Sequence, residues 1–303
     1  MLLVQAASSK EDGPSFRLKL CSFIVSRHVC HIPQAREVTE SIRKFVLVFV
    51  RQVSFPGQIP SRAAISLRIF GSLVLLPLVI AQGARTRRRV PILPPATPPH
   101  HGSIPGAGKP LRVLAIGESS VCGVGLASGD ESVAATTARA LTRITGRPIV
   151  WRAEGLSGAT VRDAREQLLP RIAPEPADLL IVAFGVNDAK AYRSPATFAE
   201  DLAELVTAAR SRVGDAAVVV GGVAPLDCFP ALPWPLRNIL GWRSAALQAA
   251  ADRLSGRLPR LVVERFTIPF EPDLFACDGF HPNRRAHAIW GEEIAALALP
   301  LIA

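Results

Sequence analysis

Five residues of the kinds that carry out acyl transfer stand at chemically suggestive places in this 303-residue sequence. Ser119 offers a hydroxyl in a sharp turn, Gly158 lies in a loop of small residues, and Asn187 offers a side-chain amide. Near the C-terminus, Asp278 precedes His281 by three residues, a spacing that one short turn can close into a cluster. A nucleophile, free backbone N–H groups, an amide donor and a carboxylate–imidazole pair are the parts that acyl transfer needs.

Ser119 alone is compatible with a phosphate-binding loop, a nucleophile turn or an ordinary exit from a strand. The dinucleotide-binding pattern GxGxxG fails, because Ser119 stands where its second glycine is needed. The nucleophile pattern GxSxG fails, because Val121 replaces its second glycine. GAGKP at 106–110 is not a P-loop either, since Ser103 replaces the first glycine and a proline follows the lysine. The turn therefore has to be interpreted together with the elements around it.

Apolar strand patterns alternate with helical patterns from residue 111 onward. The predicted strands are 112–116, 148–152, 179–184, 216–221 and 260–264. The predicted helices are 131–145, 160–172, 196–212, 236–256 and 284–298. Nearly continuous apolar strands that alternate with helices indicate a parallel sheet covered on both faces. Active sites in such sheets lie outside the carboxyl ends of the strands, where the candidate residues stand.

Four sequence blocks across residues 111–298 resemble the SGNH/GDSL hydrolase family. They are GESS with a glycine at 123, LSG at 156–158, GVND at 185–188 and DGFH at 278–281. The resemblance implies an α/β fold, a flavodoxin-like three-layer α/β/α sandwich with a parallel sheet. It also implies a serine esterase or lipase that needs no metal or organic cofactor. An acyltransferase or carbohydrate deacetylase of the same fold, and a non-catalytic membrane-tethered binding domain, remain alternatives.

The same resemblance assigns a role to each matching residue. It implies that Ser119 is the nucleophile, that His281 is the general base and then the acid, and that Asp278 orients the imidazole. It implies an oxyanion hole made by the backbone N–H groups of Ser119 and Gly158 and by the amide of Asn187.

Two positions depart from the family pattern. Glu118 stands where the family usually has Asp, which keeps the charge, and Glu154 stands where it usually has Asn, which could alter loop bonding or pocket charge. Asn187 and Asp188 could also merely cap the turn that follows them.

Other reactive side chains have structural explanations. Asp278, His281 and His287 could together bind a metal, but no further carboxylate or Cys/His spacing supports this, so we predict no metal site. Cys122 and Cys277 flank the candidate site and are more typical of small packing residues than of nucleophiles. The odd number of cysteines, five, and the absence of CxxC favour a reducing compartment without a disulfide framework.

The segment 224–242, which follows the fourth predicted strand, is unusually apolar for a loop. Phe229, Leu232 and Trp234 could line an acyl pocket, touch a bilayer or cap the core. If they line a pocket, the substrate is a small-molecule or lipid-like ester with a medium-length acyl chain.

The basic charge of the chain is confined to its N-terminal third. Residues 1–110 contain 15 Lys/Arg and 4 Asp/Glu, whereas the remainder contains 20 and 21. A near-neutral C-terminal domain argues against nucleic acid as a partner. We predict four regions: a basic extension at 1–65, an apolar membrane-associated segment at 66–90, a Pro/Gly-rich linker at 91–110 and the hydrolase domain at 111–303.

The uncharged run 69–84 is shorter than the roughly 20 residues of a spanning helix. Arg85, Arg87, Arg88 and Arg89 follow it, an order opposite to that of a cleavable signal peptide. The run and its arginines therefore predict a membrane-surface partner, with the catalytic domain facing the cytoplasm. A periplasmic or secreted domain is the alternative.

Overall fold

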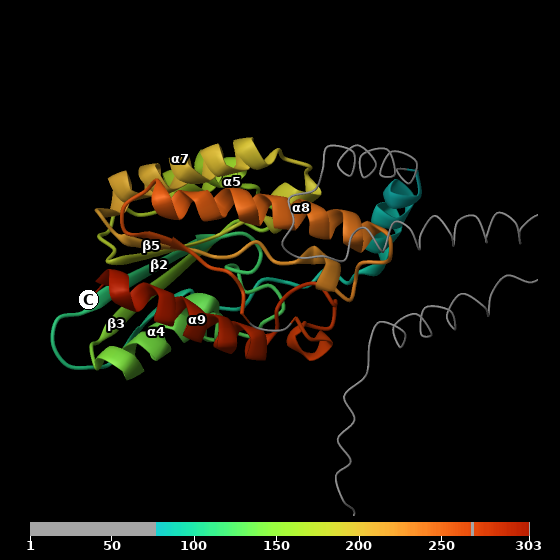
Figure 1. Cartoon of the computed structure of the whole chain (residues 1–303). Coiled ribbons are helices and arrows are strands. Elements are labelled where there is room, and N and C mark those ends of the chain that lie inside the picture. Colours follow the sequence, from blue (N-terminus) through green and yellow to red (C-terminus); the bar gives the residue numbers. More distant parts are fainter. Residues whose placement is uncertain (1–76, 268–269, 303) are drawn as a thin grey trace, which may run out of the picture. The chain divides into compact units, whose positions relative to one another are not determined.

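A six-stranded sheet lies at the centre of the computed structural model, which describes residues 77–267 and 270–302 (Figure 1). The strand order is β1-β3-β2-β4-β5-β6, with β1 antiparallel to β3 and all other neighbours parallel. The strands are β1 (His101–Ile104), β2 (Leu111–Gly117), β3 (Ile149–Gly155), β4 (Leu179–Ala183), β5 (Ala217–Val220) and β6 (Leu261–Val263). The five predicted strands are thus present as neighbours in one sheet.

Helices cover both faces of this sheet (Figure 1). One face carries α4 (Val133–Thr145) and α9 (Arg284–Ile302), and the other carries α5 (Val161–Asp163), α7 (Pro195–Val213) and α8 (Leu236–Ala251). A short helix, α6 (Val186–Lys190), follows β4. The three-layer α/β/α sandwich is confirmed.

Side chains along each strand point alternately to the two faces of the sheet, so the core has two layers. Leu114 and Ile116 of β2 pack on the side of α7 and α8, whereas Val113 and Ala115 pack on the side of α4 and α9. All four side chains are buried, because successive residues of a strand point to opposite faces and both faces are covered.

Two predicted helices are more irregular than their sequence pattern suggests. The helix predicted at 160–172 is divided after α5 into a π-helical segment (Ala164–Leu168) and a 3₁₀ turn (Leu169–Arg171). Pro170 lies in that 3₁₀ turn, where it has no N–H for a continuing helix. The helix predicted at 236–256 ends in a 3₁₀ segment (Asp252–Gly256). Further 3₁₀ turns are Gly129–Glu131, Leu226–Cys228 and Pro272–Leu274.

The predicted linker at 91–110 contributes a strand to the sheet, so that prediction is wrong for the residues of β1. His101–Ile104 pair with the segment from Ile149 to Arg152 of β3. Before this strand, Ala96 is buried and its N–H donates to the carbonyl of Cys122 at 3.1 Å. The prolines of the segment suggested a linker, but its non-proline residues retain the N–H groups that pair with an open sheet edge.

Residues 77–89 form a helix that packs on the domain built by the sheet and its helices. Val79 is buried in the core layer of α7 and α8. Gln82 Nε2 donates to the carbonyl of Trp234 at 2.8 Å, and the N–H of Leu236 donates to Gln82 Oε1 at 3.2 Å. Across the described ranges, no helix has both the length and the apolar character needed to cross a membrane. The predicted region 1–65 and residues 66–76 of the next region lie outside the described residues.

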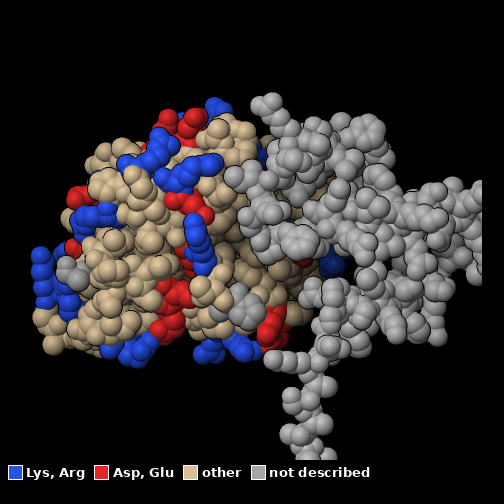
Figure 2. Space-filling model, viewed as in Figure 1, with Lys and Arg blue, Asp and Glu red and all other residues tan. Residues whose placement is uncertain are grey.

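Basic and acidic side chains are interspersed on the face of the described part that Figure 2 shows. Ion pairs among the described residues include the exposed pair Arg162–Glu166 at 2.8 Å. Exposed pairs of this kind contribute at most about 1 kcal/mol each to stability. This mixed pattern agrees with the near-neutral charge of the domain.

Candidate active site

The turn that carries Ser119 begins where β2 ends. The N–H groups of Val121 and Cys122 both donate to the carbonyl of Glu118, at 3.0 and 3.2 Å. A Cβ on Gly117 would lie 2.3 Å from a methyl of Val121 and 2.7 Å from the carbonyl oxygen of Ala183. The chain can therefore turn this sharply only with glycine at position 117.

Ser119, His281 and Asp278 form one hydrogen-bonded chain. His281 Nε2 lies 3.0 Å from Ser119 Oγ, and His281 Nδ1 lies 2.6 Å from Asp278 Oδ2. The other oxygen of Asp278 accepts the backbone N–H groups of Phe280 and His281 at 2.9 and 3.0 Å. When Nδ1–H donates to Asp278, Nε2 is left with its lone pair toward the serine hydroxyl. This arrangement is the one in which an imidazole can accept the serine proton.

The loop after β3 lies against the serine turn. The N–H of Leu156 donates to the carbonyl of Gly117 at 2.9 Å, and Gly155 packs so closely on Cys122 that a Cβ would lie 2.4 Å from its sulfur. Gly158 is exposed in this loop with a φ of +81°, a conformation that favours glycine. Among the described residues, the N–H groups of Ser119 and Gly158 have no hydrogen-bond acceptor.

Asn187 is buried, and both hydrogens of its amide already have acceptors. Nδ2 donates to the carbonyl of Ala159 at 3.2 Å and to the carboxylate of Glu118. On the other side of the amide, Lys190 Nζ donates to Oδ1 at 2.8 Å. The amide predicted as an oxyanion donor is thus engaged within the protein.

Glu118 and Asp188 are buried carboxyl groups around this amide. Glu118 also accepts the N–H groups of Val186 and Asn187, at 3.0 and 3.1 Å, and Asp188 accepts the N–H of Val161 at 3.1 Å. Burial raises the pKa of Glu118 to about 7 and that of Asp188 to about 6. Asn187 and Asp188 therefore do more than cap the turn after them, because Asp188 also ties α6 to the start of α5.

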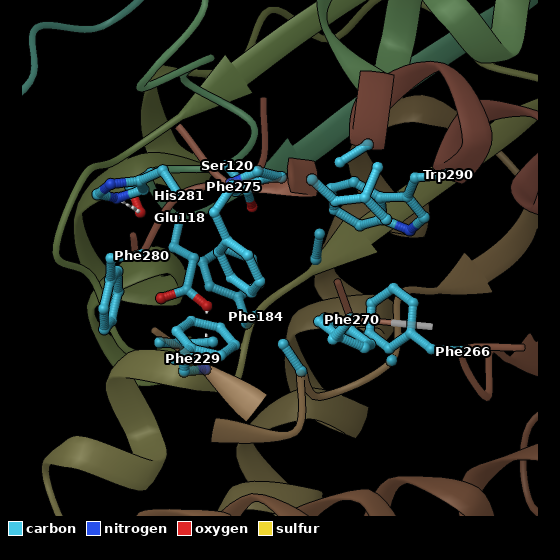
Figure 3. Close-up of a pocket in the computed structure, with 18 residues that line it drawn as sticks. Glu118, Ser120, Phe184, Phe229, Phe266, Phe270, Phe275, Phe280, His281 and Trp290 are labelled. Carbon is cyan, nitrogen blue, oxygen red and sulfur yellow. Dashed lines mark hydrogen bonds between the residues drawn. The ribbon is translucent and has the colours of Figure 1, made fainter. Parts of the chain in front are cut away.

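An apolar cavity of about 100 Å³ opens beside Ser119 and His281 (Figure 3). Aromatic rings dominate the labelled lining, and Trp290 lies at the side away from His281. Its lining residues are Glu118, Ser119, Ser120, Ala183, Phe184, Val186, Gly222, Ala224, Phe229, Phe266, Phe270, Leu274, Phe275, Phe280, His281, Pro282, Ala286 and Trp290.

Comparison with known proteins identifies the family. Residues 115–289 match the sequence profile of the GDSL-like lipase/acylhydrolase family. The chain belongs to this family. A GDSL-like esterase of Mycobacterium tuberculosis is 28% identical over 258 residues, which cover 76% of this chain and 81% of that protein. The chain is accordingly a carboxylic ester hydrolase.

Solved structures agree with this GDSL fold. The family 3 carbohydrate esterase of Clostridium thermocellum has a TM-score of 0.51 and 15% identity, covering 64% of this chain and 98% of that one. The structure of TesA has a TM-score of 0.51 and 20% identity, covering 63% of this chain and 99% of that one. At such identities these two structures are evidence for the fold alone.

One of the three residues predicted to form an acyl pocket lies on the cavity of this GDSL protein. Phe229 lines it, but Leu232 is buried in the core and Trp234 is 47% exposed; neither lines the cavity. For these two residues the acyl-pocket alternative does not hold: Leu232 follows the core alternative and Trp234 is left on the surface, because a loop's apolar content does not tell which of its side chains face a cavity.

Six aromatic residues of the cavity were missed in the sequence, among them Phe184 and Trp290. The other four come from one segment between β6 and α9 and recur every four or five positions: Phe266, Phe270, Phe275 and Phe280. This recurrence, in a segment that leads directly to the DGFH block, was the signal available. Phe229 from the preceding loop packs edge-on against two of these rings, with centroids 5.1 Å from Phe275 and 5.0 Å from Phe280.

The remaining candidate residues of the sequence analysis do not line the cavity. His287 is fully buried, and burial lowers its pKa to about 3. Within the described residues no group of three or more His, Cys, Asp or Glu side chains could hold a metal ion. Cys122 and Cys277 are free thiols, and burial raises the pKa of Cys122, which works against nucleophilicity. Glu154 lies within β3, opposite Ile116 of β2, and does not line the cavity.

Proposed function

We propose that this GDSL hydrolase cleaves acyl esters through a Ser119–His281–Asp278 triad and an acyl-enzyme. The observation that supports this most is the continuous hydrogen-bonded chain from Ser119 Oγ through the imidazole to Asp278. Ser119 Oγ attacks the ester carbonyl carbon while His281 Nε2 accepts its proton. His281 then returns that proton to the alkoxy oxygen, and the alcohol leaves. Water attacks the acyl-enzyme in the same way, releasing the acid and restoring the serine.

The negative charge on the carbonyl oxygen needs donors during both attacks. The N–H groups of Ser119 and Gly158 supply two of them, since neither has an acceptor among the described residues. The amide of Asn187 supplies the third when one of its hydrogens leaves the carbonyl of Ala159. The Asp278 side chain stabilises the imidazolium that forms in each step.

The aromatic cavity beside Ser119 is suited to the acyl chain. Its labelled walls are mainly phenylalanine and tryptophan rings, which favour a hydrocarbon chain over a sugar (Figure 3). We therefore propose medium-chain, lipid-like esters as substrates.

Association with a membrane surface belongs to the same proposal. Leu78 and Ile80 are 46% and 62% exposed on the helix at 77–89, and the last turns of that helix carry Arg85 and Arg87–Arg89. Apolar side chains beside basic ones favour an interface with anionic lipid. Cosedimentation of the full chain with anionic and with neutral vesicles tests this, and equal recovery with both would contradict it.

The function is tested with p-nitrophenyl acetate, butyrate, octanoate and palmitate on the full-length protein and on Ser119→Ala. We expect the highest kcat/KM on butyrate or octanoate, and turnover that vanishes in Ser119→Ala. Ser211→Ala is the matched control, because that exposed hydroxyl on α7 lies outside the triad and the cavity. Undiminished turnover in Ser119→Ala would exclude the mechanism. If Ser119→Ala loses turnover but the full-length protein prefers acetylated sugars to these esters, the triad is retained and the acyl-chain assignment is excluded.

A further inference from the structure

The carboxyl group of Glu118 lies inside the site, although its residue precedes the nucleophile in the sequence. Its side chain is 5% exposed and lines the aromatic cavity. Figure 3 shows the carboxyl group between the rings of Phe280 and Phe184, on the side toward Phe229. A carboxyl group among aromatic rings has a desolvation cost, which its hydrogen bonds have to offset.

Those hydrogen bonds all come from the beginning of α6. Oε1 accepts the N–H of Val186 at 3.0 Å, and Oε2 accepts the N–H of Asn187 at 3.1 Å. Oε2 also accepts the side-chain amide of Asn187. Glu118, which directly precedes the nucleophile, is therefore bonded to both the backbone and the side chain of Asn187, the residue proposed to stabilise the oxyanion.

The two hydrogens of the Asn187 amide are held unequally. One goes to Oε2 of the Glu118 carboxyl group, which the N–H groups of Val186 and Asn187 hold in place. The other goes to the carbonyl of Ala159 at 3.2 Å, at the long end of the usual range for an N–H···O bond. An incoming oxyanion can replace the bond to Ala159 while the bond to Glu118 still holds the amide.

We propose that Glu118 is a positioning residue for the oxyanion hole, fixing the amide plane of Asn187 so that its second hydrogen can pass from Ala159 to the oxyanion. Lys190 fixes the same amide from its oxygen side, at 2.8 Å. This inference rests on the proposed function, because it assigns Asn187 a part in stabilising the tetrahedral intermediate.

The proposal is tested by a double-mutant cycle on p-nitrophenyl butyrate, with Glu118→Ala, Asn187→Ala and the two combined. Losing one oxyanion donor costs about 10²–10³ in kcat, so we expect that loss for Asn187→Ala. We expect Glu118→Ala to lower kcat by about 10–100-fold with KM changed by less than about threefold, since the hydrogen bond that fixes the Asn187 amide is lost. The combined variant should be no slower than Asn187→Ala, because Glu118 acts through that amide.

Glu118→Gln is the conservative variant, which should keep most of the activity that Glu118→Ala loses and so serves as a second test. A glutamine carbonyl oxygen can accept both groups of Asn187, while its NH₂ cannot accept from Val186. We expect this variant to lose only about threefold to tenfold in kcat, and none of that loss in the Asn187→Ala background. If Glu118→Ala does not fold, Glu118→Gln alone and combined with Asn187→Ala replace it in the double-mutant cycle. Glu166→Gln, an exposed carboxylate on the π-helical segment, is the matched control and should equal wild type.

Three outcomes would overturn the inference: multiplicative losses in the combined variant, a change confined to KM, or wild-type kcat in both Glu118 variants. Labelling of Ser119 by a fluorophosphonate separates these from failure of the proposed function. If Ser119→Ala is inactive but the cycle shows no coupling, only the role of Glu118 is lost. If Ser119→Ala keeps turnover, the esterase mechanism itself fails.

Discussion

The two ends of the candidate site are built in different ways. The polar end consists of short sequence blocks that stand after separate strands or before α9, and hydrogen bonds hold its side chains in place. The aromatic end consists mainly of one segment between β6 and α9, which lines the cavity together with Phe184 and Phe229 from other loops. Hydrogen bonds are directional and fail with a small displacement, whereas apolar packing tolerates changes of shape. We therefore expect changes at the polar end to affect rate and changes at the aromatic end to affect selectivity.

The largest effect is expected at the polar end, from Asp278→Asn. An asparagine there favours the wrong imidazole tautomer, so kcat should fall by about 10³–10⁴ with KM little changed. Steady-state kinetics on p-nitrophenyl butyrate measure this. Asp273→Asn removes an exposed carboxylate that pairs with Arg285 and should leave kcat unchanged. A loss below about tenfold in Asp278→Asn would mean that the carboxylate contributes little to orienting the imidazole.

The aromatic end is tested by Phe229→Ala, which enlarges the cavity. We expect the ratio of kcat/KM for octanoate over butyrate to rise by about tenfold, since a pocket discriminates by about 1–3 kcal/mol per methylene. Phe198→Ala is the matched control, because Phe198 is a fully buried ring of α7 that does not line the cavity. Both variants should lose about 3–5 kcal/mol of stability. An equal change of ratio in both would show that destabilisation, not cavity shape, sets the preference.

A smaller effect concerns the buried carboxyl group behind the aromatic end. Glu264 Oε2 accepts from Trp290 Nε1 at 2.8 Å, and burial raises the pKa of Glu264 to about 8. The folded state then binds more protons than the unfolded state between pH 4.5 and 8. The contribution of Glu264 to the free energy of unfolding should therefore fall as pH rises through that window and stay low above it.

Urea denaturation at pH 5.5 and pH 8.5 measures this dependence, because the first pH lies within that window and the second lies above it. Glu118, whose pKa is raised to about 7, adds a decrease of the same sign. Glu264→Gln should reduce the difference between the two conditions, whereas the exposed Glu166→Gln should not. An unchanged difference in Glu264→Gln would show that its carboxyl group is not protonated in the folded protein.

The smallest effect is expected away from both ends, at the helix of residues 77–89. Gln82→Ala removes its two hydrogen bonds to the segment around Trp234, and should lower Tm by about 2–4 °C. Neither kcat nor the chain-length ratio should change. A shift in that ratio would show that this helix also shapes the cavity. The exposed Gln167 supplies the control variant, Gln167→Ala, and should leave Tm unchanged.

The strands and the polar end were accessible from the sequence because their signals are local. Apolar runs predicted β2 to β6 within a few residues, and a parallel sheet brings the residues after its strands to one edge. Ser119, Asp278 and His281 accordingly meet, although Ser119 and His281 are 162 positions apart. The roles assigned to them remain predictions that the experiments above test.

Other features depended on contacts between distant segments. Leu232 and Trp234 belong to the same apolar loop as Phe229, yet only Phe229 faces the cavity. The rings of Phe266 and Phe280 form part of its wall because the segment between β6 and α9 returns to the serine turn. No local pattern distinguishes an apolar side chain that lines a cavity from one that fills the core.

The sequence by itself determined the order of strands and helices, the family, and the residues that stand at the carboxyl edge of the sheet. Short-range periodicity and turn chemistry are enough for the elements and for the residues that follow them, and four short blocks carry the resemblance to the family. Only the tertiary structure decided that β1 joins the sheet, that the helix at 77–89 packs on the domain, and that Glu118 holds Asn187. Each of these depends on long-range contacts, and such contacts form only when the whole chain has closed around its core.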